Sequence, residues 1–175
     1  MDAATFENII RKYQYSFHRV VDFIPEKDQL LPLDFTQQNT GLTPQILGDE
    51  HVFNNYIQQK LQNTNSRYGI GGYAEHRTIY SISPVFNGAQ PGEEPRRLHL
   101  GVDIWGPVGT KVYAFMGGMI HSFAFNDQFG DYGATLILLH QLDGLPFYTL
   151  YGHLSVRDIQ TLSAGQYVSI GQTIG

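Results

Sequence analysis

A β-hairpin signal stands out in residues 135–155, TLILLHQLDGLPFYTLYGHLS. Two runs rich in Leu, Ile, Thr, Phe and Tyr are joined there by Leu-Asp-Gly-Leu. Asp-Gly between two such runs is typical of a tight hairpin, because both residues tolerate the positive φ angles that the turn requires. We therefore expect an antiparallel sheet in the C-terminal half of the chain.

Other short segments of this half are bounded by glycine. The segments TKVYAF, GMIHSFAF and QYVSIGQTIG each resemble a short strand. Closely spaced glycines allow tight turns between strands, so the pattern predicts a strongly curved antiparallel sheet. FNDQFGDYG is the longest turn-rich loop of this half, and such loops often border a functional site.

The N-terminal part has a different periodicity, and the change falls near residues 63–72. Apolar residues from Phe6 to Val21 recur at spacings of three and four, which predicts one amphipathic helix. Pro25 ends this helix in the prediction. The stretch LLPLDFTQQN that follows is predicted to be irregular.

Two further helices are expected before the change in periodicity. Thr43, followed by proline, is a typical helix start, and Asp49 is a typical cap for the next helix. Residues 1–66 are thus expected to form a helical N-terminal extension that packs on a neighbouring domain or a partner. Residues 67–175 are expected to form the second domain, and the fold class is α+β with a mainly antiparallel sheet.

Composition narrows the classes of function. The chain has 175 residues, of which 42% are hydrophobic, which suits one compact domain with an extension. A net charge of −5 and scattered Lys and Arg argue against a nucleic-acid partner. The chain has no cysteine, so a transition-metal site must use His and carboxylate ligands. We see neither a signal peptide nor a membrane segment, and expect a soluble, cytoplasmic protein.

A histidine and an aspartate in RLHLGVDIWGPVG form the first candidate site. His99 and Asp103 lie four residues apart, so both side chains of an extended segment point to the same face. Their Cα atoms would be ~13 Å apart at ~3.3 Å per residue, too far for one metal. Gly101 lies between them, where a bend costs least. The pair can be a metal site, a solvated pair or a buried hydrogen bond.

A third candidate is His153 in FYTLYGHLS. It follows an apolar β-rich run and a glycine, where a strand leaving the sheet can present an imidazole over a groove. The alternative is a packed or capping histidine. Tyr151, two residues earlier, either shares the face of His153 or packs in the core.

Together these motifs resemble the lysostaphin/LytM-type zinc metallopeptidases. The resemblance runs from Leu98 to Gly175 and rests on HLGVDIWGPVGTKVYA, GGMIHSF, GDYGATLILLHQLDGLPFYTLYGHLS and LSAGQYVSIGQTIG, in that order. It implies a fold like the duplicated hybrid motif, with a strongly curved sheet. It also implies that His99 and Asp103 bind Zn²⁺ and that His153 is the catalytic histidine. The implied activity is endopeptidase cleavage of peptides, of the kind found in peptidoglycan, by a zinc-activated water.

One part of the family pattern is missing from the printed sequence. The family's final His-x-His supplies a third zinc ligand and follows the segment matched by GQTIG, but the sequence stops at Gly175. A catalytic zinc takes about three protein ligands. We therefore expect either a piece of a longer protein, inactive as written, or a relative that binds or regulates without catalysis. Enzymes of this family are normally exported, so a cytoplasmic location suggests recycled wall peptides or other small peptides.

Two other interpretations concern the remaining motifs. Gly-spaced strands also occur in biotinyl and lipoyl carrier domains, but the comparable turn at 115–118 has no lysine. Five histidines are expected to be non-catalytic, although His76 in the run EHR could help to bind substrate. These five are His18, His51, His76, His121 and His140.

Overall fold

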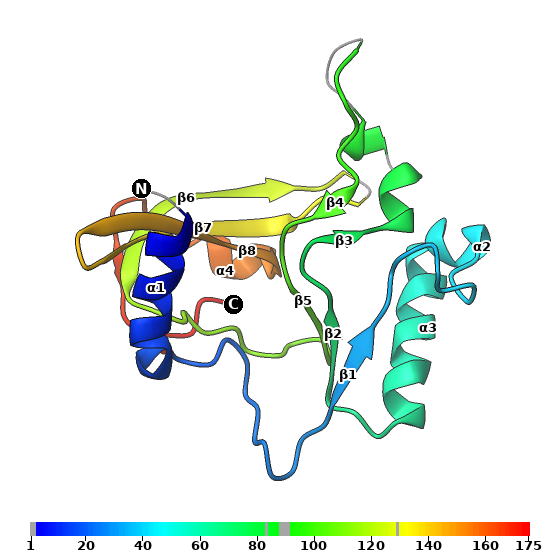
Figure 1. The fold of residues 1–175 in the computed structure, drawn as a ribbon, viewed down its shortest axis with the longest axis horizontal. Helices are drawn as coiled ribbons and strands as arrows, with labels where there is room; N and C mark the ends of the chain where they lie inside the picture. The colour runs from blue at the N-terminus through cyan, green and yellow to red at the C-terminus, as the bar shows by residue number, and fades with distance from the viewer. Residues whose placement is uncertain (1–2, 83, 88–91, 129) are drawn as a thin grey trace. The chain divides into compact units, whose positions relative to one another are not determined.

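The computed structural model describes residues 3–82, 84–87, 92–128 and 130–175. Its contacts divide the chain into two units (Figure 1). Met1–Phe23 and Gly109–Gly175 form the terminal unit, and Ile24–Val108 forms the central unit. Each unit has its own hydrophobic core.

The terminal unit is built on an antiparallel sheet. Within the described residues this sheet has four strands in the order β8-β7-β6-β9. Asp143 and Gly144 connect β7 to β8 with φ angles of 50° and 77°, as the tight hairpin turn requires. The hairpin prediction is therefore confirmed. The strands are β6 Gly118–Asn126, β7 Gly133–Leu142, β8 Leu145–Leu154 and β9 Tyr167–Val168, and a short helix α4 Val156–Ile159 follows β8.

The sheet is strongly curved, and the long strands β6, β7 and β8 show this in Figure 1. Its register shifts between Ile120 and Ser122 of β6 and between Ala134 and Leu136 of β7. Such bulges bend a strand and increase its twist. One face covers a core of buried residues, so the α+β class with a curved antiparallel sheet is confirmed. The core residues are Ala114, Ile120, Leu136, Leu138, Val168 and Ile174.

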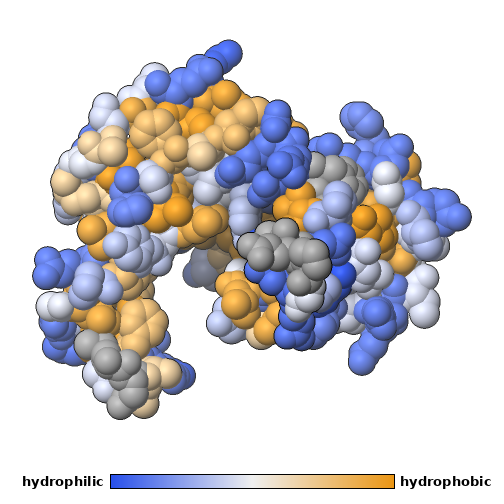
Figure 2. All heavy atoms as spheres, turned by 90° about the horizontal axis from the view of Figure 1, so that it is seen from above, coloured by the Kyte–Doolittle hydropathy of each residue, from blue (hydrophilic) through white to orange (hydrophobic). Residues whose placement is uncertain are grey.

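The other face of the sheet is apolar but exposed. Met119 of β6 and Tyr148 and Leu150 of β8 lie on this face and are exposed. Apolar side chains at the surface are also visible among the polar ones in Figure 2. Because side chains alternate between the faces of a strand, their neighbours fill the core.

The first helix is shorter than predicted. It runs as α1 Ala3–Tyr13 with one further 3₁₀ turn, Gln14–Ser16, and the prediction of a helix to Val21 is wrong. The backbone from His18 to Val20 pairs with another segment instead. The N–H of His18 donates to the carbonyl of Phe115 at 2.7 Å, and the N–H of Tyr113 donates to that of Val20 at 2.9 Å. These long-range bonds compete with further helical turns.

The segment TKVYAF is not a regular strand. Its pairing is an isolated bridge between Tyr113 and Thr173, and its neighbours Val112 and Ala114 exchange backbone hydrogen bonds with residues 171–175. The helix α1 is fixed to the β7–β8 turn of the same unit. Tyr13 donates from its hydroxyl to Asp143 Oδ1 at 2.5 Å, and Lys12 Nζ lies 2.7 Å from Oδ2.

The central unit contains a second sheet, in the order β1-β2-β5. The strand β1 Leu30–Leu33 lies in the stretch predicted to be irregular, so that prediction is wrong for these residues. It pairs in parallel with β2 Tyr68–Gly71, which in turn pairs antiparallel with β5 Asp103–Trp105. Pro32 obscured the strand in the sequence, yet proline is tolerated at a sheet edge, where β1 lies.

Two helices of the central unit confirm the capping predictions. The side chain of Thr43 accepts from the N–H of Ile46 at the start of α2 Pro44–Leu47, and Asp49 caps α3 Glu50–Asn63. Both helices bury one residue each in the core of this unit, Leu47 and Ile57 respectively.

The described residues contain no helix long and apolar enough to cross a membrane. The domain boundary at residues 66 and 67 and the cytoplasmic location stay predictions.

A core substitution in the terminal unit should be costly. Leu138 is fully buried on β7, so Leu138→Ala is expected to lower the free energy of unfolding by about 2–5 kcal/mol through lost burial and a cavity. Leu150→Ala on β8 is the control, because Leu150 is 48% exposed and its loss should cost much less. Urea unfolding followed by circular dichroism measures both. Equal losses would mean that β8 is covered by another surface.

Candidate functional site

Two short ladders of the central unit position the first pair of candidate residues. The strand β3 Glu75–His76 pairs with β4 Leu98–His99, which places His99 opposite Glu75. The ladder of β2 and β5 places Asp103 opposite Gly71. The two paired segments of the chain therefore run from one ladder to the other over the same distance in sequence, four residues from Gly71 to Glu75 and four from His99 to Asp103. Between the ladders the segment from β2 to β3 turns through Ala74, whose φ is 55°.

The bend between these ladders brings the two side chains together. His99 Nε2 lies 3.6 Å from Asp103 Oδ1. Gly101 makes this possible for a second reason besides backbone freedom. A Cβ at this position would lie 3.1 Å from His99 Nε2 and 3.3 Å from Cε1, so a side chain there would press on the imidazole. The expected bend at Gly101 is therefore present.

Burial favours the neutral form of the His99 imidazole. The residue is only 7% exposed, and burial lowers its pKa, although the nearby Asp103 carboxylate opposes this shift. Within the described residues Nε2 has no hydrogen-bond partner, and 3.6 Å is too long for a bond to Asp103. A buried polar atom without a partner is costly, and a bound ion or water is one way to satisfy it.

A zinc ion fits the chemistry of this pair. Zinc lies about 2.0–2.2 Å from imidazole nitrogen and carboxylate oxygen, so two such ligand atoms are about 3.4 Å apart in a tetrahedral site. The 3.6 Å between Nε2 and Oδ1 is close to that value. No group of three or more His, Asp or Glu side chains that could hold a metal occurs in the described ranges. The pair thus supplies two candidate ligands.

Three further side chains surround the pair. The Tyr80 hydroxyl lies 2.5 Å from His99 Nδ1 in a buried hydrogen bond. Arg77 Nη1 donates to Asp103 Oδ2, and Arg77 Nε donates to Glu75 Oε2 at 2.9 Å. Arg77 is only 7% exposed. Among the residues that the structure describes, each candidate ligand therefore has one atom bonded to a protein side chain, and its other atom lies on the side of the second ligand.

The run EHR contains a local signal for two of these side chains, Glu75 and Arg77. Its middle residue, His76, lies in the exposed position of β3. Because successive residues of an extended chain point to opposite sides, an exposed His76 turns Glu75 and Arg77 inward together. Tyr80 has no such local signal, because it lies in the 3₁₀ helix Thr78–Ser81.

The remaining candidate, His153, belongs to the terminal unit. It lies next to the last residue of β8 and is exposed. Its φ is 56°, a left-handed conformation, and its N–H donates to the carbonyl of Tyr132 at 2.6 Å. A Cβ at Gly152 would lie 3.2 Å from the Tyr132 ring, so this position needs glycine. Tyr132 belongs to the predicted loop FNDQFGDYG, of which Phe129 lies outside the described residues.

Other residues of the terminal unit have structural contacts. His140 is buried, and both ring nitrogens have partners, the carbonyl of Gly117 at 2.9 Å and Thr149 Oγ1 at 2.7 Å. It therefore has no lone pair left for a metal. Tyr151 packs against the core, its hydroxyl accepts from the N–H of Phe115 at 3.3 Å, and burial raises its pKa. The core interpretation of Tyr151 is the one that the structure favours.

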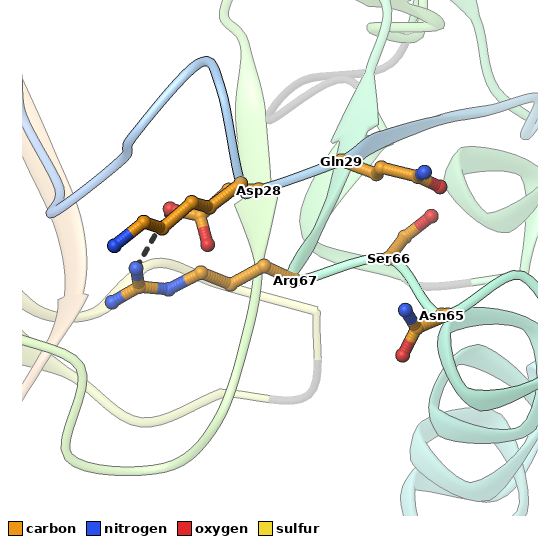
Figure 3. A pocket seen from close by; sticks show the side chains of 6 residues that line it. Asp28, Gln29, Asn65, Ser66 and Arg67 are labelled. Atoms are coloured by element: carbon orange, nitrogen blue, oxygen red, sulfur yellow. Dashed lines mark hydrogen bonds and ion pairs between the residues drawn. The ribbon is translucent and has the colours of Figure 1, made fainter.

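A polar pocket of about 370 Å³ in the central unit contains none of the candidate residues (Figure 3). Its main interaction is the ion pair between Arg67 Nη1 and Asp28 Oδ2, 2.8 Å apart. The residues that line it are Lys27, Asp28, Gln29, Asn65, Ser66 and Arg67.

Comparison with known proteins covers the segment that contains His99, Asp103 and His153. Residues 97–175 match the sequence profile of peptidase family M23. A relative from Vibrio cholerae serotype O1, peptidoglycan DD-endopeptidase ShyC, is 30% identical over 122 residues. These residues are 65% of this chain but only 26% of that protein, so the chain spans a small part of its relative. No solved structure matches the chain.

Proposed function

We propose, on the premise that residues 97–175 are a peptidase family M23 domain, that the protein is a zinc-dependent endopeptidase acting on peptides of the peptidoglycan type. The resemblance to lysostaphin/LytM-type peptidases seen in the sequence is confirmed by that match and by the endopeptidase relative.

One observation carries the proposal. The buried Nε2 of His99 has no hydrogen-bond partner in the described part of the chain and faces Asp103 Oδ1 at 3.6 Å. A neutral imidazole and a carboxylate are the ligands that zinc takes when cysteine is absent. His99 and Asp103 are therefore the side chains that hold the metal in this proposal.

The chemistry divides between the metal site and His153. A zinc ion held by His99 and Asp103 would supply a Lewis acid able to polarise a peptide carbonyl and to activate water for attack. His153 exchanges a proton at its imidazole, or donates a hydrogen bond to the carbonyl oxygen as negative charge develops there. Its exposed position on β8 suits either role, because the ring can reach a substrate.

The substrate class follows from the relative. Its name assigns that protein an endopeptidase activity on peptidoglycan. For this chain we propose the same class, a cross-linked peptide of peptidoglycan. A net charge of −5 argues against polyanions as the primary substrate.

Cleavage should depend on metal. Purified peptidoglycan incubated with the full-length protein should release peptide cross-link products, because zinc activates the attacking water. Chromatography of the digests measures this. A chelator should abolish the products, and added Zn²⁺ should restore them.

Two outcomes would contradict this function. Cleavage that resists thorough chelation would rule out metal-assisted hydrolysis. Zinc-loaded protein that binds peptidoglycan and releases nothing would favour the alternative, a non-catalytic binding or regulatory domain of the same fold.

A further inference from the structure

We propose that Tyr80 and Arg77 are positioning residues, which orient the side chains of His99 and Asp103 toward one metal ion. The inference rests on the proposed zinc site and adds the groups that fix its geometry. Both residues come from one short segment, the end of β3 and the 3₁₀ helix that follows it. Neither residue was a candidate from the sequence.

Tyr80 controls the imidazole. A histidine can bind a metal through Nε2 only when its proton is on Nδ1, and a partner on Nδ1 orients the ring for this. Here the partner is the Tyr80 hydroxyl, 2.5 Å from Nδ1, which can accept from Nδ1–H in the metal-binding tautomer and holds the ring in one orientation. The Tyr80 ring is itself held by stacking on Phe86, with centroids 3.9 Å apart.

Arg77 controls the carboxylate. Its Nη1 donates to Asp103 Oδ2, which leaves Oδ1 as the oxygen that faces His99. Arg77 is held in turn by Glu75 Oε2 at 2.9 Å, and Glu75 Oε1 accepts from the N–H of Phe35 at 2.9 Å. An arginine bound on two sides cannot swing away, so Asp103 keeps one orientation.

The contacts of Tyr80 with His99 and of Arg77 with Asp103 orient the two candidate ligands toward each other. In each candidate ligand a protein side chain bonds the outer atom, and no described residue donates to or accepts from the atom between the two ligands. These inner atoms are His99 Nε2 and Asp103 Oδ1, 3.6 Å apart. Buried nitrogens without a partner in the described residues also include Arg77 Nη2 and Trp105 Nε1, but those two can only donate, whereas the imidazole Nε2 of His99 can offer a lone pair to zinc. A preorganised metal site requires that arrangement.

The test measures metal affinity in Tyr80→Phe and Arg77→Lys. The first variant deletes one oxygen atom, and the second keeps the charge but cannot hold Glu75 and Asp103 together. Loss of such a partner typically weakens metal binding about 10–100-fold. Competition with a chromogenic chelator gives the zinc affinity of the full-length protein. The visible spectrum of the Co²⁺-substituted protein should change as well, because it reports ligand geometry.

Matched controls exist in the same unit. Tyr56→Phe removes a hydroxyl that accepts from Asn39 Nδ2 at 3.3 Å, far from any candidate ligand in sequence. Arg67→Lys alters another Arg–Asp pair, the one that Figure 3 shows with Asp28. Both controls should keep wild-type zinc affinity and the wild-type Co²⁺ spectrum. Melting curves of the metal-free proteins show how far each substitution affects the fold alone.

The outcomes separate this inference from the proposed function. Wild-type affinity and spectrum in Tyr80→Phe and Arg77→Lys would overturn it, and so would affinity losses no larger than those of the controls. If Arg77→Lys does not fold, the double variant Glu75→Gln/Arg77→Gln replaces it, since this leaves no unpaired charge at Glu75. His99→Ala is measured beside them. If it also keeps its zinc, the proposed metal site itself is wrong.

Discussion

His99→Ala and Asp103→Ala are each expected to remove most of the bound zinc from the full-length protein. Each substitution deletes one of the two ligand atoms that face each other at 3.6 Å. Losing a ligand should cost more than losing a partner of a ligand, which weakens binding about 10–100-fold. We therefore expect affinity to fall by more than ~100-fold, and peptidoglycan cleavage to disappear with the metal.

Metal analysis of the purified variants by atomic absorption tests this. His51→Ala is the control for the histidine, because His51 is exposed on α3 of the same unit. Asp127→Ala is the control for the aspartate, since Asp127 is exposed in a loop. Both should keep the wild-type metal content. If His99→Ala and Asp103→Ala keep it too, the pair is structural and its unsatisfied nitrogen needs another explanation.

Local signals in the sequence predicted the elements that local chemistry determines. The Asp-Gly turn adopts two positive φ angles, and Thr43 and Asp49 cap the helices that they were expected to start. These features depend on residues no more than four positions apart, so they can be predicted from a short stretch of sequence.

Long-range pairing explains the wrong predictions. The apolar period that should have continued α1 to Val21 is interrupted, because the backbone at His18 and Val20 bonds to Phe115 and Tyr113. Likewise Leu30–Leu33 becomes a strand only because Tyr68–Gly71 is available as its partner. Neither partner is visible in a local window of sequence.

The candidate site shows the same division. Spacing and glycine left several roles open for His99 and Asp103, and the family resemblance implied that they bind zinc; the bend places Nε2 and Oδ1 3.6 Å apart. The partners on their outer atoms, Tyr80 and Arg77, lie 19 and 26 residues from the side chains that they hold. Their contribution depends on how β3 pairs with β4, which composition and periodicity do not specify.

Loss of the His153 imidazole is expected to leave zinc bound while reducing cleavage by about 10²–10⁴-fold. That is the usual contribution of a positioned acid-base group. The left-handed φ of 56° at this residue decides which substitution to use. Asn, Asp and His adopt this conformation more readily than alanine does, so alanine would mix a folding effect with the chemical one. Asparagine tolerates this conformation, so His153→Asn removes the imidazole with the least disturbance of β8.

Steady-state cleavage rates and metal content are measured together in His153→Asn and His153→Gly. Glycine also accepts the positive φ, so both variants should show the same loss if the imidazole is what matters. His121→Ala is the control, because His121 is an exposed histidine of the same sheet, on β6. It should cleave at the wild-type rate. If zinc and activity disappear together in the His153 variants, His153 is a ligand, and an unchanged rate would remove it from the chemistry altogether.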